Sequence, residues 1–161
     1  MTQTATISPD LQRPAVPEFE RTAASIAEAL VESAGVEAGD RVLALGDARG
    51  RVARAAAARG AVLHVVDPAL VELPFADDEF DHALSSFGLM WSPRPSATAS
   101  EMVRVTRSDG TVACTVWGDA VSAGALRRMR SLVSDFEVTL GSFRSGAEAP
   151  GERYCVISGR K

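Results

Sequence analysis

The stretch from Val36 to Val66 constrains the fold of this chain more than any other feature of the sequence. It reads as a buried strand, a glycine-containing turn, a helix and a second strand that is closed by Asp67. This order of elements is how α/β folds build a nucleotide pocket. Two features are unusual: the glycine pattern of the turn is incomplete, and few residues follow Asp67 before the next motif. The sequence therefore predicts a nucleotide-binding ancestry with an altered pocket.

Apolar residues at helical and strand spacing divide the whole chain into alternating elements. Helices are predicted over 18–34, 51–59, 96–106 and 121–135. Strands are predicted over 41–45, 61–66, 81–86, 111–117, 137–143 and 154–158, with a turn at Asp109-Gly110. This alternation predicts an α/β fold with a mostly parallel sheet. The last two strands are joined by a polar loop without helical pattern, which predicts an antiparallel hairpin at the C-terminal end.

Length and charge limit the classes of protein to which the chain can belong. Its 161 residues predict a single domain over 18–161, preceded by a flexible, threonine- and proline-containing arm over 1–17. The net charge of −4 argues against a nucleic-acid-binding surface. No segment approaches the roughly 20 apolar residues that span a bilayer. The N-terminal segment has neither a basic start nor an apolar run, so we expect no signal peptide and a cytoplasmic location. The abundance of alanine and arginine is typical of GC-rich bacterial genomes.

Four strings of residues carry a family resemblance. "GVEAGDRVLALG" resembles the lead-in to the first motif of the class I S-adenosylmethionine (SAM)-dependent methyltransferases. "LPFADDEFD" resembles their loop before the fourth strand, "SSFGLMW" that strand, and "EMVRVTRSDGTVACTVW" the helix, turn and strand that follow. The likeness runs from about residue 18 to residue 158 and is greatest to the small-molecule methyltransferases of ubiquinone and menaquinone biosynthesis. It implies a Rossmann-like methyltransferase sheet, SAM as the cofactor and a small molecule as the methyl acceptor.

The resemblance implies a cofactor site, and the turn of that site is the first of two departures from the family pattern. Its cofactor-binding residues are expected to be Gly46, Asp47, Gly50 and Asp67. The family has a third glycine where this chain has Ala48, which adds a methyl group at the narrowest point of the turn, and an acid where it has Ala44. Asp47 is a candidate substitute for that acid as the partner of the ligand's ammonium group. Its neighbour Arg49 is a candidate contact for a carboxylate or phosphate instead.

A second departure concerns the length of the chain after Asp67. Only five residues separate Asp67 from Leu73, whereas a parallel crossover needs about a dozen or more. We therefore expect the sheet to lack one strand-helix unit. Asp67 then has two alignments, as the ribose-binding acid or as the acid on the adenine side. The loss also leaves the 61–66 strand as an exposed sheet edge, which a homodimer could cover.

The substrate side of the pocket is expected at Ser86, Phe87, Met90 and Trp91, which follow the third strand. Ser85, Ser86 and Phe87 lie at the strand end that should face the crevice and could equally well only finish that strand. Trp117 could serve the pocket or the core. His64 is interpreted as a core histidine, and His82 is not expected to be catalytic, because it starts its strand at the end away from the usual ligand crevice. No catalytic residue is assigned, because methyl transfer can proceed by proximity and orientation without a protein nucleophile.

Several alternatives remain open at this stage. We expect no metal site, and we expect Cys114 and Cys155 to be reduced thiols that lie close together if their strands are neighbours. The "RRMR" run at Arg127–Arg130 is interpreted as a solvated helix face.

The first hypothesis for function is a SAM-dependent small-molecule methyltransferase. The alternative is an inactive binding or dimerisation module that has lost SAM binding, and a weaker third is an unrelated reaction on the same scaffold.

Overall fold

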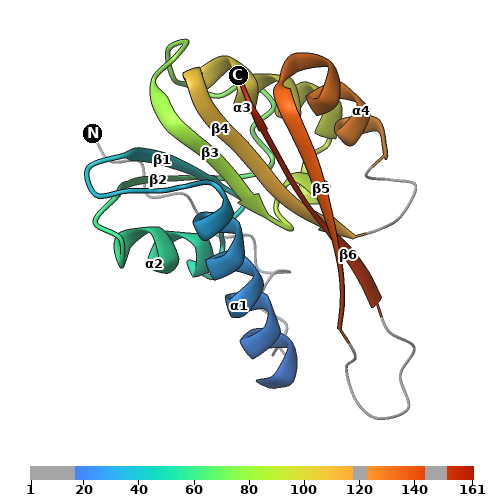
Figure 1. The fold of residues 1–161 in the computed structure, drawn as a ribbon. Coiled ribbons are helices and arrows are strands. Elements are labelled where there is room, and N and C mark those ends of the chain that lie inside the picture. Colours follow the sequence, from blue (N-terminus) through green and yellow to red (C-terminus); the bar gives the residue numbers. More distant parts are fainter. Residues whose placement is uncertain (1–16, 118–122, 144–151) are drawn as a thin grey trace.

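The computed structural model describes residues 17–117, 123–143 and 152–161, which form one six-stranded sheet flanked by helices (Figure 1). The helices are α1 (Pro17–Ser33), α2 (Arg51–Ala57), the 3-10 helix η2 (Leu89–Trp91), α3 (Pro95–Val105) and α4 (Ala123–Leu132). The strands are β1 (Arg41–Leu45), β2 (Val62–Val66), β3 (Phe80–Ser86), β4 (Thr106–Trp117), β5 (Ser134–Phe143) and β6 (Glu152–Arg160). The arm predicted over 1–17 lies outside the described residues except for Pro17, which begins α1.

The strands follow the order β2-β1-β3-β4-β6-β5 across the sheet. The neighbouring pairs among β2, β1, β3 and β4 are parallel, whereas β6 runs antiparallel to both β4 and β5. This topology confirms the predicted α/β fold, with its mostly parallel sheet and its C-terminal antiparallel hairpin.

The core lies on the two faces of the sheet. On one face, α1 and α2 bury a cluster that includes Leu30, Val52 and Leu84. On the other, α3 and α4 bury a larger cluster that includes Met102 and Met129. Because helices cover both faces, β1 and β3 are almost continuously buried, which explains their unbroken apolar sequences.

Element boundaries differ from the sequence prediction in two places. The turn predicted at Asp109-Gly110 is instead an irregularity within β4, where Asp109 has φ +63° and the pairing with β3 shifts register. The helix predicted over 121–135 ends earlier, at Leu132, because Asp135 takes φ +50° and the chain has already entered β5. Residues 121 and 122 lie outside the described part of the chain.

The sheet ends at β2, as expected for a chain that lacks one strand-helix unit. The segment 67–79 connects β2 to β3 without any helix. Its Phe75 ring packs edge-on against Phe80 at 4.9 Å between centroids, and His64 packs edge-on against both rings at 5.9 and 5.3 Å. The three rings therefore cover part of the sheet face beside β2 with side chains instead of a helix.

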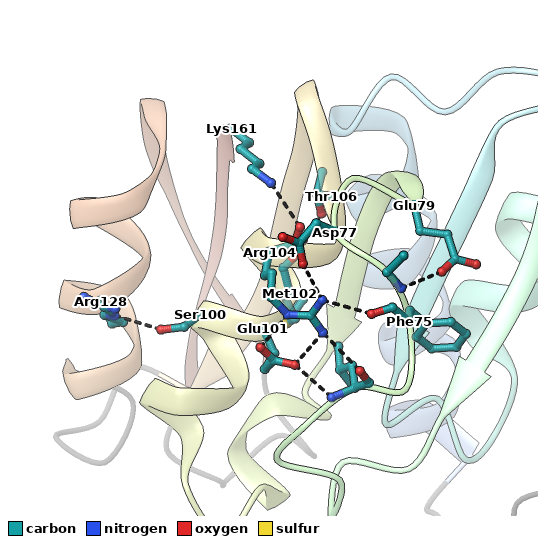
Figure 2. A network of polar contacts seen from close by, with 12 residues as sticks. Phe75, Asp77, Glu79, Ser100, Glu101, Met102, Arg104, Thr106, Arg128 and Lys161 are labelled. Carbon is teal, nitrogen blue, oxygen red and sulfur yellow. Dashed lines mark hydrogen bonds and ion pairs between the residues drawn. The ribbon is translucent and has the colours of Figure 1, made fainter.

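Arg104 on α3 holds this segment in place (Figure 2). Its guanidinium donates to the carbonyl oxygens of Leu73 (3.0 Å) and Phe75 (2.9 Å) and to Asp77 Oδ1 (2.7 Å). Glu101 accepts from Arg104 at 2.7 Å through each carboxylate oxygen, and from the Leu73 N–H at 2.9 Å. The hydrogen bonds that Arg104 donates, first to Glu101 and then to Asp77, raise the pKa of Arg104, and the bond to Glu101 lowers the pKa of Glu101. We call this set of contacts the Arg104 clamp.

Removal of the clamp is expected to destabilise the whole domain. Arg104→Ala leaves two carbonyl oxygens and the Glu101 carboxylate without their donor, so the free energy of unfolding should fall by about 2 kcal/mol. Urea unfolding followed by circular dichroism measures this loss. Arg128→Ala is the control, because among the described residues the exposed Arg128 side chain loses a single 2.8 Å hydrogen bond, to the Ser100 Oγ, and should change stability by no more than about 0.5 kcal/mol. Equal effects of the two substitutions would contradict the clamp's role.

Candidate functional site

Two glycines bring the carboxyl ends of β1 and β3 into close contact. Gly46 follows β1 with φ +68°, and a Cβ atom added to it would lie 2.5 Å from the Gly88 Cα. A Cβ atom on Gly88 would in turn collide with the Leu45 carbonyl oxygen. Each position therefore requires glycine. Sequence reasoning missed Gly88, whose only signal is a glycine two residues after the end of a predicted strand.

A cavity of about 240 Å³ opens at these strand ends. It is lined by residues from the turn after β1, from the segment after β2 and from the segment after β3: Gly46, Asp47, Ala48, Arg49, Arg51, Pro68, Ser86, Phe87, Met90 and Trp91. The structure thus brings together two of the predicted cofactor residues and all four predicted substrate-side residues. Gly50 and Asp67 do not line the cavity. Gly50 instead precedes α2 with φ +64°.

The Asp47 side chain organises the turn after β1. Its Oδ1 accepts from the Val52 N–H at 3.2 Å and its Oδ2 from the Ala53 N–H at 2.8 Å, so the carboxylate caps the start of α2. Burial raises the pKa of Asp47, and the hydrogen bonds from Ala53 and Val52 act against that rise. The carboxylate is therefore engaged by the backbone of its own chain as well as lining the cavity.

Asp67 lies at the carboxyl end of β2, beside the cavity. Its Oδ1 accepts from the Ala69 N–H at 2.8 Å, which stabilises the turn after β2. The next residue, Pro68, is buried and lines the cavity. The Gly46 N–H donates to the Val66 carbonyl oxygen at 2.9 Å and so joins the two turns.

The end of β3 contains two serines with different surroundings. The Ser85 hydroxyl donates to the Leu45 carbonyl oxygen at 3.1 Å and accepts from the Leu89 N–H at 2.8 Å, so it holds the strand ends together. Ser86 lines the cavity instead. Phe87 follows with φ +60°, a conformation held by a 2.9 Å hydrogen bond from its N–H to the Thr115 carbonyl oxygen. The structure thus separates a bracing serine from a cavity-facing one, which the sequence left undecided.

The remaining candidates lie away from this cavity. His82 is near the opposite end of β3, where its Nε2 lies 3.0 Å from Asp40 Oδ2. The arginines of the Arg127–Arg130 run are exposed, as expected of a solvated face. A second cavity of about 460 Å³ lies between α1 and α2 and is lined mainly by charged and alanine side chains, none of them a predicted site residue.

Register places the two cysteines on neighbouring strands but not opposite one another. Cys114 faces Ile157 across β4 and β6, and Cys155 faces Val116. The Cys114 Sγ lies 3.6 Å from Met129 Sδ in the core. The side chains of Cys155 and Trp117 lie outside the described residues.

The described residues contain no group of three or more histidine, cysteine, aspartate or glutamate side chains suited to hold a metal ion. Within the same ranges, none of the helices combines the length and the apolar character needed to cross a membrane.

Comparison with known proteins identifies the family. The sequence profile described as "Methyltransferase domain" matches residues 20–114, more than half of the chain. An uncharacterized protein of Mycobacterium tuberculosis is 34% identical over 122 residues, and the match covers 61% of this chain and 44% of that protein. The chain spans about half the length of the curated relatives it matches.

Two solved structures share the fold. The 1,6-didemethyltoxoflavin-N1-methyltransferase of Burkholderia thailandensis, solved with bound S-adenosylhomocysteine (SAH), matches with a TM-score of 0.66 and 18% identity over 89% of this chain and 80% of that one. The cyclase SpnF matches with a TM-score of 0.64 and 16% identity over 93% and 84% of the two chains. The chain therefore belongs to the methyltransferase-domain family and has the class I SAM-dependent methyltransferase fold.

Proposed function

We propose that this protein transfers a methyl group from SAM to a small molecule. The observation that carries the proposal is that the turn after β1 and the segment after β3 line one and the same cavity. Family membership supplies the reaction class, and the cavity supplies a place for it. Since the chain spans only part of its relatives, the activity of the whole protein is itself part of this proposal.

The residues around the cavity fit one end of the cofactor better than the other. The close approach of Gly46 and Gly88 leaves backbone exposed to a ligand at the strand ends, as a nucleotide-derived ligand requires. The cavity of about 240 Å³ is smaller than the roughly 300–1,000 Å³ of typical ligand pockets. In the described part of the chain, no strand or helix lies beyond β2 to form a further wall. The fit is therefore good at the glycine turn and open on the side of Asp67.

In this proposal Gly46, Asp47, Gly50 and Asp67 hold SAM, whose sulfonium carries the methyl group to be transferred. Asp67 follows the strand directly beside β1, which favours its alignment as the ribose-binding acid. Phe87 and Met90 exclude water from the acceptor side, and Trp91, which is 64% exposed, stands at the mouth. Binding and orientation are the tasks of these side chains, because the reaction needs no protein nucleophile.

The role of Asp67 can be tested without disturbing its turn. Asp67→Asn keeps an oxygen for the Ala69 N–H but removes the charge, so the affinity for SAH should fall about tenfold or more while stability stays unchanged. Isothermal titration measures the affinity. Glu72→Gln, which neutralises an exposed acid on the same segment, is the control and should leave the affinity as it is. Unchanged affinity in Asp67→Asn would contradict the assignment.

A second candidate role is self-association through β2, and it also accommodates an inactive binding module. The Val62 N–H donates to the Asp40 carbonyl oxygen and the Gly46 N–H to the Val66 carbonyl oxygen, so the backbone groups of Leu63 and Val65 point away from β1. β2 contains no aspartate, glutamate, lysine, arginine or proline, the residues that commonly block pairing at a sheet edge. Its Val62 and Val65 side chains are 51% and 46% exposed. We propose that a second copy pairs with this edge about a two-fold axis.

If the dimer forms through β2, a charge placed on β2 should disrupt it and a charge placed on β5, at the other edge of the sheet, should not. Val65→Glu places a charge on the proposed interface and should convert a dimer into a monomer in light scattering coupled to size-exclusion chromatography. Val138→Glu is the matched control, since Val138 is 49% exposed on β5 at the other edge, and it should leave the dimer intact. A monomeric wild-type protein, or equal dissociation of both variants, would contradict this role.

A cytoplasmic location and a bacterial source belong to the same proposal. The low cysteine content fits a reducing compartment, and the curated relatives from Mycobacterium fit the alanine- and arginine-rich composition.

A further inference from the structure

Two buried hydroxyl groups at the strand ends lack hydrogen-bond partners. Among the described residues, Ser86 Oγ and Thr115 Oγ1 are buried and neither donates nor accepts a hydrogen bond. Ser86 is 8% exposed and Thr115 is 0% exposed. The two residues are register partners on the parallel strands β3 and β4, so their side chains point to the same face of the sheet.

The other buried hydroxyls in the described part of the chain are all satisfied. Ser85 bonds to the Leu45 carbonyl oxygen at 3.1 Å, and Thr106 bonds to the Met102 carbonyl oxygen at 2.7 Å. Ser92 and Thr98 bond to each other at 2.6 Å. A buried polar group without a partner is costly, so native proteins leave few of them, and those few call for an explanation. The unpartnered hydroxyls of Ser86 and Thr115 thus differ from the other buried hydroxyls described in this protein and from the usual pattern in native proteins.

The local backbone aims Ser86 at the cavity. Phe87 follows it in the left-handed region at φ +60°, a conformation that bulky residues rarely adopt and that clusters at active sites and ligand clamps. The hydrogen bond from its N–H to the Thr115 carbonyl oxygen fixes this turn at 2.9 Å. As a result Ser86 and Phe87 line the same cavity, with Thr115 directly beside Ser86 in the sheet.

We propose that Ser86, whose register partner Thr115 lies beside it in the sheet but does not line the cavity, is the polar contact through which the cavity selects a methyl acceptor that carries a hydroxyl group. This inference rests on the proposed function only in treating the ligand as a methyl acceptor. The contact between Ser86 and a ligand hydroxyl depends on the cavity alone. Ser86 and Thr115 are positioning and selectivity residues in this scheme.

The surroundings of Ser86 favour a neutral hydroxyl on an otherwise apolar compound. A serine hydroxyl both donates and accepts, which matches a ligand hydroxyl that does the same. Beside it the cavity is walled by Phe87 and Met90, side chains that suit a planar or aliphatic body. A carboxylate would be drawn instead to Arg49 and Arg51, which line the cavity from the segment after β1. Because the site offers buried polar atoms, an analogue without the hydroxyl leaves them unsatisfied and is rejected.

The first arm of the test is stability and needs no ligand. If the two hydroxyls serve a ligand, Ser86→Ala and Thr115→Val remove only unsatisfied groups, so the Tm should stay at or above that of the wild type. Ser85→Ala is the matched control on the same strand, because it deletes two hydrogen bonds and should lower the Tm by about 3 °C or more. A fall in Tm for Ser86→Ala and Thr115→Val as large as that for Ser85→Ala would overturn the inference, since the hydroxyls would then be structural.

The second arm is selectivity, measured by NMR titration of the full chain with phenol and with its isostere toluene, each with and without SAH. The wild type should bind phenol about tenfold more tightly than toluene, and Ser86→Ala should abolish the preference. Thr115→Val should reduce it. Equal binding of the two probes by the wild type, or a preference that survives in Ser86→Ala, would overturn the inference. A phenol preference in a protein that does not bind SAH would keep this inference and contradict the proposed methyl transfer.

Discussion

The Arg104 clamp is the interaction on which the rest of this structure depends. A class I methyltransferase sheet that stops at β2 loses the helix that would cover the neighbouring face, and the segment 67–79 has to cover it instead. That segment forms no helix of its own, so its carbonyl groups need donors from elsewhere. Arg104 supplies them from α3, and with Glu101 it fixes Phe75 against the sheet (Figure 2). A local charge network thus replaces a missing element of secondary structure.

This arrangement shapes the site at the strand ends. The clamp fixes the segment that leads from β2 into β3. At its other end β3 closes at Ser86, and Phe87 follows it. The glycine pair Gly46 and Gly88 then brings that end against the turn after β1. The cavity between them keeps a glycine-lined wall and an apolar wall, and Pro68, which follows Asp67, lines it as well. In the described part of the chain no strand lies beyond β2, so the proposed cofactor site and the proposed dimer interface both follow from the same shortening of the sheet.

Sequence patterns predicted the elements well and the site in part, for a physical reason. Periodicity and strand–helix alternation are local, so β1 and β3 were predicted to within one residue. The clamp depends on contacts between Arg104 and residues about thirty positions away, which no local pattern encodes. The same limit hid the requirement for Gly88 and the difference between Ser85 and Ser86, because each follows from a neighbouring strand. The irregularity at Asp109 was predicted as a turn, because an Asp-Gly pair is a turn signal in the sequence and only the pairing with β3 shows that it lies within a strand.

The central claim of the proposed function is that this shortened fold still binds SAM at the β1–β3 strand ends, since a shared fold does not fix function. The most direct test is a titration of isotope-labelled protein with SAH, followed by amide NMR. The account predicts saturable shifts that centre on Gly46–Gly50, Asp67 and Ser86–Met90 and leave β5 unchanged. No shifts at millimolar SAH, or shifts confined to the second cavity, between α1 and α2, would contradict it.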